Sequence, residues 1–112
     1  MKSAIICSRV LDGVPGIQHG FGTIARVIPP VLGEAEWLRR KPFWKQIHGV
    51  GVAQVKGVSQ TCGEVDALWT KGERLPVAVV TADCLPVLLA RVDGGAVASL
   101  HAGWRGVRAR II

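Results

Sequence analysis

The sequence has few of the features that mark secreted, membrane-spanning or repetitive proteins. Its 112 residues include only three cysteines, an odd number without a short repeated spacing, which argues against a disulfide framework and for a reducing compartment. The longest apolar stretch, Leu75 to Ala90, is split by Asp83 and is shorter than the run of about 20 apolar residues that a membrane span needs. The segment from Ser3 to Cys7 is too short for the core of a signal peptide. We therefore expect a soluble, cytoplasmic protein without internal repeats.

Acidic and aromatic residues are also scarce. Eight Asp and Glu stand against fourteen Lys and Arg, which gives a formal charge of +6, and aromatic residues make up 5% of the chain. Such a charge allows a nucleic acid, a membrane surface or a phosphorylated small molecule as partner. The basic residues form only two loose clusters, over Arg39 to Lys45 and over Arg105 to Arg110, and no known nucleic-acid-binding module accompanies them. We expect neither a nucleic acid nor a membrane as partner.

Apolar residues make up 49% of the sequence, enough for the core of one modest domain. A helix is predicted over Gly33 to Arg40, because acidic residues open this segment and two arginines close it, with Trp37 and Leu38 as its buried face. The polar residues 57–64 are predicted to form a loop in which Cys62 has an incidental role. Short strands or strand-like segments are expected over Ala4–Cys7, Ile17–Thr23 (alternatively a loop), Lys45–Lys56 and Val65–Thr70.

Residues 76–106 are the segment in which a role in catalysis or ligand binding is more plausible than a purely structural role. Pro76 to Ala82 is apolar and β-branched, which predicts a strand covered on both faces. The runs Leu85 to Ala90 and Ala96 to Leu100 flank an Asp-Gly-Gly sequence that suits a tight turn, so they should pair as an antiparallel hairpin. That hairpin would return His101 to the neighbourhood of Cys84.

Cys84, His101 and His48 form a set of donors that matches two kinds of metal. A thiolate with two neutral imidazoles suits a three-ligand zinc site that keeps its fourth position open, and sulfur with imidazole also suits copper. Their wide spacing matches no compact metal-binding motif, so the spacing alone favours structural histidines over a metal site. Asp66 is either a turn or cap residue or a site carboxylate, and spacing alone favours the cap. His19 is most simply an ordinary surface or hydrogen-bonded histidine, and Cys7 a core thiol.

Four motifs in one order give a specific resemblance. QIHG at 46–49, DALWT at 66–70, TADCLPVLL at 81–89 and HAGWRG at 101–106 resemble the YfiH family, also called the multicopper polyphenol oxidase or laccase-domain family. The resemblance implies an α+β fold of mixed sheets in a sandwich with outer helices. It also implies that His48, Cys84 and His101 bind a zinc ion, with copper as the alternative.

The resemblance further implies an activity on purine nucleosides and phosphate. Family members are described as phosphorolysing adenosine, inosine, guanosine and methylthioadenosine and as deaminating adenosine. In such an enzyme Arg105 would contact phosphate or an oxyanion, unless it makes a surface salt bridge. Asp83 would orient a histidine, unless it caps a turn.

Other functions fit some of the same residues. Cys84 as a thiolate nucleophile with His101 as its base would suit an amide hydrolase that edits peptidoglycan precursors. A laccase-like copper oxidoreductase is disfavoured because only three histidines are present. A basic binding module is the non-enzyme alternative. We expect residues 1–112 to be a single incomplete YfiH-like domain, truncated after the HAGWRG motif, which self-associates or requires a missing C-terminal half.

Overall fold

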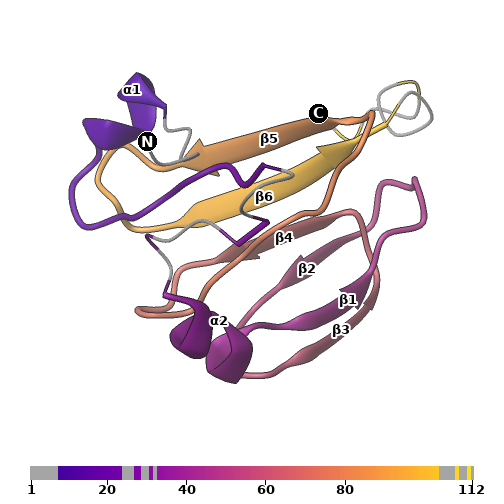
Figure 1. Cartoon of the computed structure of the whole chain (residues 1–112), viewed down its shortest axis with the longest axis horizontal. Coiled ribbons are helices and arrows are strands. Elements are labelled where there is room, and N and C mark those ends of the chain that lie inside the picture. Colours follow the sequence, from indigo (N-terminus) through magenta and orange to yellow (C-terminus); the bar gives the residue numbers. More distant parts are fainter. Residues whose placement is uncertain are drawn as a thin grey trace.

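The computed structural model describes residues 8–23, 27–28, 31, 33–103, 108 and 111, and it contains two short helices and six strands in that part of the chain (Figure 1). The predicted strand Ala4–Cys7 and residues 104–107, with Arg105, lie outside the described residues. No helix in the described ranges is long and apolar enough to cross a membrane. In chain order the elements are α1 (Arg9–Asp12), α2 (Glu34–Arg40), β1 (Phe43–Lys45), β2 (Val52–Gln54), β3 (Thr61–Glu64), β4 (Ala67–Thr70), β5 (Leu85–Ala90) and β6 (Val97–Ala102).

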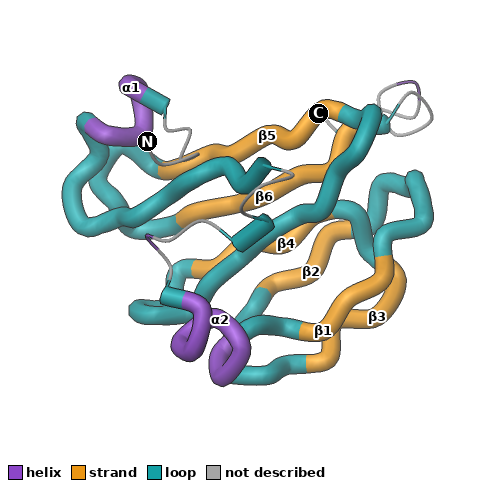
Figure 2. Tube along the Cα trace, in the orientation of Figure 1, coloured by secondary structure: helices purple, strands orange, loops and turns teal. Residues whose placement is uncertain are grey.

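The strands form two sheets. β1 and β3 pair in parallel, and the second sheet has the order β2-β4-β6-β5, in which β2 and β4 are parallel and the other pairs antiparallel. Both helices lie outside the sheets, and the longest loop between two strands joins β4 to β5 (Figure 2). The α+β class with mixed sheets is therefore confirmed.

One hydrophobic cluster takes side chains from both sheets. Val55, Val65 and Leu68 are buried at its centre. Packed against them are the partly buried Trp44, Ala53, Cys62, Leu75 and Val77. Since burial of one such aliphatic side chain contributes about 1.5–3 kcal/mol, this cluster stabilises the packing of the two sheets against each other.

The predicted hairpin is present. β5 and β6 pair antiparallel from Leu85 opposite Ala102 to Ala90 opposite Val97. The turn between them places Gly94 at φ 77°, a conformation that glycine adopts without steric cost. The Asp93 carboxylate accepts a hydrogen bond from the Gly95 amide at 2.8 Å. Local turn chemistry therefore fixes the register that carries β6 back toward the start of β5.

Two predicted elements are wrong. Pro76 to Ala82 has the composition of a buried strand but pairs with no described strand, and the Gln46 side chain instead hydrogen-bonds both the amide (2.8 Å) and the carbonyl (2.7 Å) of Val80. Residues 57–64, predicted as a loop, contain β3, because β1 offers Thr61–Glu64 a parallel partner. Both errors concern strand pairing, which depends on distant residues.

The helix prediction is correct in place but wrong about its buried face. α2 spans Glu34–Arg40 with Gly33 as its N-cap. Trp37 is half-buried and meets Trp44 edge to face, with ring centroids 6.5 Å apart, whereas Leu38 is exposed. The segment Ile17–Thr23, left open between strand and loop, is a loop with an isolated bridge at Phe21.

β5 is an edge strand of the larger sheet within the described ranges. Leu85 and Leu89 on it are 56% and 52% exposed. Apolar side chains on an open edge favour association with another chain or segment. Self-association, or cover by a further segment, remains a prediction at this edge.

Two buried hydroxyl groups give a matched test of the fold. Ser99 Oγ on β6 has no hydrogen-bond partner among the described residues, whereas Thr70 Oγ1 on β4 donates to the Val55 carbonyl at 2.7 Å and accepts from the Gly72 amide at 3.0 Å. Ser99→Ala should leave the free energy of unfolding unchanged or raise it by up to about 1 kcal/mol, and Thr70→Val should lower it by about 1–3 kcal/mol. Urea denaturation checks both, and an equal loss in the two variants would show that Ser99 has a partner.

Candidate metal centre

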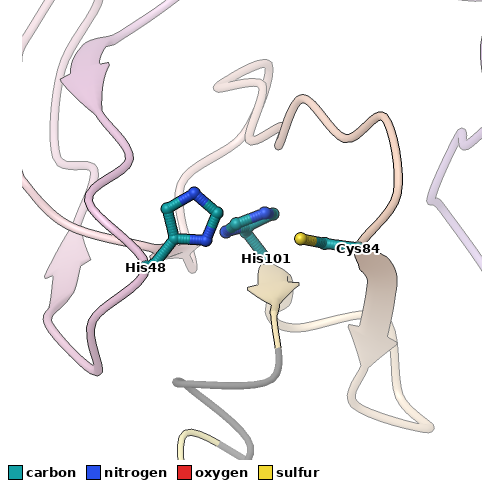
Figure 3. Close-up of side chains that lie close together, drawn as sticks. All are labelled: His48, Cys84 and His101. Atoms are coloured by element: carbon teal, nitrogen blue, oxygen red, sulfur yellow. The ribbon is translucent and has the colours of Figure 1, made fainter.

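Three side chains from distant parts of the sequence meet at one end of the larger sheet. His48 lies in the loop between β1 and β2, Cys84 immediately before β5, and His101 on β6 (Figure 3). One nitrogen of each imidazole and the Cys84 sulfur all lie within 4.8 Å of one another. The hairpin accounts for part of this arrangement, because it sets Pro86 opposite His101.

The three residues differ in exposure. His101 is 4% exposed, Cys84 is partly buried, and His48 is exposed. The two imidazoles meet edge to face, with centroids 4.9 Å apart and planes at 72°. The group therefore has a fixed, buried side and a side that is open to solvent.

A buried carboxylate connects both histidines. Asp66, which directly precedes β4, has no solvent exposure. Its Oδ2 lies 2.7 Å from His101 Nδ1 and accepts from the His48 amide at 3.0 Å, and its Oδ1 accepts from the amides of Ile47 at 2.9 Å and Gly49 at 3.0 Å. The Asp66 carbonyl also accepts from the His101 amide at 2.7 Å.

These bonds determine the charge of Asp66. Burial by itself would raise the pKa of the Asp66 carboxyl, but the hydrogen bonds from Ile47, Gly49, His101 and His48 outweigh it and leave that pKa below its usual value. Asp66 is therefore ionised at neutral pH. Since an ionised carboxylate only accepts hydrogen bonds, His101 Nδ1 carries a proton, and in the neutral imidazole Nε2 is then the nitrogen with the free lone pair.

The backbone of His48 has an uncommon conformation. Its φ of 60° lies in the left-handed region, which few residues other than glycine adopt. Three consecutive amides, from Ile47 to Gly49, converge on the Asp66 carboxylate and hold the loop in this shape. Strained backbone that its surroundings fix in this way clusters at functional sites.

Gly103 leaves room among the three side chains. A β-carbon at this position would lie 3.0 Å from His48 Nδ1, 3.1 Å from the Cys84 sulfur and 3.7 Å from His101 Cε1. Any larger residue would therefore press on two of the donor atoms.

The donor set fits a zinc ion. Zinc takes sulfur at about 2.3 Å and imidazole nitrogen at about 2.0–2.1 Å, so the donors of one tetrahedral ion lie roughly 3.3–3.6 Å apart. The donor atoms of His48, Cys84 and His101, all within 4.8 Å, need only small side-chain movements to reach that separation. Three protein donors leave a fourth position for water or substrate.

Asp83 is exposed, and in the described part of the chain the carboxylate bonded to a histidine of the site is that of Asp66. The role of Asp83 in orienting a histidine stays a prediction. Sequence reasoning favoured a cap over a site carboxylate for Asp66. The available signal was its position directly before an apolar strand, because a carboxylate that becomes buried there requires several hydrogen-bond donors.

The remaining candidates lie elsewhere. His19 Nε2 accepts from the Ser8 amide at 2.8 Å, which agrees with the hydrogen-bonded histidine that was expected. Cys62 is a half-buried residue of β3, where burial raises the pKa of its thiol despite a hydrogen bond from Gln60. A cavity of about 960 Å³ reaches Thr70 and Val97, at the ends of β4 and β6 remote from Asp66 and His101, and none of the three donors lines it.

Comparison with known proteins gives consistent matches over part of the chain. Residues 32–112 match the family model described as multi-copper polyphenol oxidoreductase laccase. The chain is 41% identical over 76 residues to the protein named purine nucleoside phosphorylase YfiH of Escherichia coli (strain K12), a match that covers 67% of this chain and 31% of that protein. It is 44% identical over 72 residues to a purine nucleoside phosphorylase of Xylella fastidiosa (strain 9a5c), covering 59% of this chain and 28% of that protein.

A solved structure shows the same partial coverage. The crystal structure of YlmD from Geobacillus stearothermophilus superposes with a TM-score of 0.58 at 30% sequence identity, over 69% of this chain and 33% of that one. The matched segments thus span only about a third of these proteins.

Proposed function

Because the chain belongs to the family described as multi-copper polyphenol oxidoreductase laccase, we propose that it is the metal-binding part of a zinc-dependent purine nucleoside enzyme. The observation that carries the proposal is the convergence of the His48, Cys84 and His101 donors within 4.8 Å. The names of the relatives support purine nucleosides and phosphate as substrates. The proposed reactions are phosphorolysis of adenosine, inosine, guanosine and methylthioadenosine and deamination of adenosine.

The residues of this chain would prepare the site in distinct ways. Cys84 contributes a thiolate, and His101 presents Nε2 because its Nδ1–H is bonded to Asp66. His48 lies on the solvent side, where a substrate can approach. A bound zinc ion would supply a Lewis acid and lower the pKa of a coordinated water toward about 7. Arg105 remains our proposal for the phosphate contact, since a guanidinium matches phosphate geometry.

Zinc is favoured over a set of copper ions by the number of donors. The whole sequence contains three histidines, and His19 is bonded to the Ser8 amide rather than placed with the others. A single copper on two histidines and one cysteine remains the alternative metal.

One feature favours a second activity. Asp66, His101 and Cys84 are arranged as the orienting carboxylate, base and nucleophile of a cysteine hydrolase would be. In that case the Cys84 thiolate would attack an amide, such as one in a peptidoglycan precursor, and no metal would be required.

Metal content and product analysis separate these functions. The longest polypeptide that the gene encodes is purified, its metals are measured, and nucleosides are supplied with and without phosphate. We expect about one zinc per chain, nucleoside cleavage only with phosphate, and deamination of adenosine with or without it. A chelator should abolish both activities and zinc should restore them. Full activity after complete metal removal would contradict the proposal.

A further inference from the structure

We propose that Asp66 is the positioning residue that prepares both histidines for metal binding, an inference that rests on the proposed metal site. Among the described residues, no other side chain hydrogen-bonds to both histidines of the site. The Asp66 carboxylate holds the His101 ring through Nδ1 and the His48 backbone through three amides. One carboxylate therefore fixes the positions of both histidines.

For His101, Asp66 selects the tautomer. With Asp66 Oδ2 accepting at 2.7 Å, the proton resides on Nδ1, and Nε2 is ready to bind a metal without losing a proton. The same bond restricts ring rotation, and His101 is almost completely buried, so the direction of Nε2 is set before any metal arrives.

For His48, Asp66 acts through the backbone. The exposed imidazole has no carboxylate partner of its own among the described residues, so its position depends on the loop that carries it. That loop keeps a φ of 60° at His48 because the Asp66 carboxylate accepts hydrogen bonds from three consecutive amides, those of Ile47, His48 and Gly49. Loss of the carboxylate would remove these bonds and release the loop.

Asp66→Asn is the informative change because it keeps the size of the side chain and removes two acceptor sites. Asn presents one oxygen and one NH2, but donors face both carboxylate oxygens of Asp66. If the amide nitrogen faces His101, Nδ1 must become the acceptor and the proton moves to Nε2, the atom intended for the metal. If it faces Ile47 and Gly49, two amides lose their acceptor.

Zinc affinity is measured by competition with a chromophoric chelator, and unfolding by urea. We expect Asp66→Asn to bind zinc about 10–100-fold more weakly than the wild type. The control is Thr70→Val, at the end of β4 remote from Asp66, which should lose stability and keep its zinc affinity. Equal zinc affinity in Asp66→Asn and the wild type would overturn the proposal.

The tautomer gives a second readout that does not require the variant to fold. Nitrogen NMR of the metal-free wild type should show His101 with a protonated Nδ1 and a bare Nε2, and a proton on Nε2 would overturn the proposal. If the wild type binds no zinc, the proposed function fails by itself. The His101 tautomer then still decides whether Asp66 positions the ring.

Discussion

Cys84→Ala is expected to abolish nucleoside turnover and to remove the bound zinc. Cys84 supplies the only sulfur among the three donors, and its loss leaves two imidazoles for an ion that the protein would otherwise hold with three ligands. Because loss of a residue that merely orients a ligand costs about 10–100-fold in metal affinity or activity, loss of a ligand should cost more. Turnover of inosine with phosphate and metal analysis of the purified variant measure the effect.

Cys62→Ala is the matched control for this change. Cys62 packs against the core from β3, and burial raises the pKa of its thiol, so it is a poor source of thiolate at neutral pH. Turnover and zinc content should stay nearly unchanged in Cys62→Ala, and likewise in Cys7→Ala. Equal losses in all three variants would mean that the substitutions act on folding.

Gly103→Ala is expected to weaken zinc binding by about 10–100-fold, comparable to loss of a group that orients a ligand. Its new methyl group would lie 3.0 Å from His48 Nδ1 and 3.1 Å from the Cys84 sulfur, closer than ordinary van der Waals contact. In the metal-free protein the exposed His48 ring can move aside, so stability should change little. A bound ion would fix both donor atoms, and the clash would then be unavoidable.

Gly57→Ala separates this local effect from the general effect of replacing a glycine. No atom lies within 4 Å of a β-carbon built on Gly57. Its substitution should therefore leave zinc affinity intact and act only through the entropy of the unfolded chain, at about 0.4–1 kcal/mol. Unchanged zinc affinity in Gly103→Ala would show that the metal does not sit between His48 and Cys84.

The sequence by itself determined the features that depend on neighbouring residues. The Asp-Gly-Gly turn specified the hairpin of β5 and β6, and charged residues at the two ends of Glu34–Arg40 specified α2. The hairpin then made the approach of His101 to Cys84 predictable, because antiparallel register follows from the turn. His48 was grouped with this pair by donor type alone, and the resemblance of the QIHG motif to a family then made the grouping specific, since no local pattern connects His48 to the hairpin.

Tertiary structure alone decided the features that depend on distant partners. Pro76 to Ala82 and Thr61 to Glu64 have compositions that mislead, because a segment becomes a strand only when another strand is free to pair with it. Asp66 shows the same dependence at the site. Its hydrogen-bond donors lie 17, 18, 19 and 35 residues away, so its burial and its hold on both histidines arise only when the loop, β4 and β6 pack together.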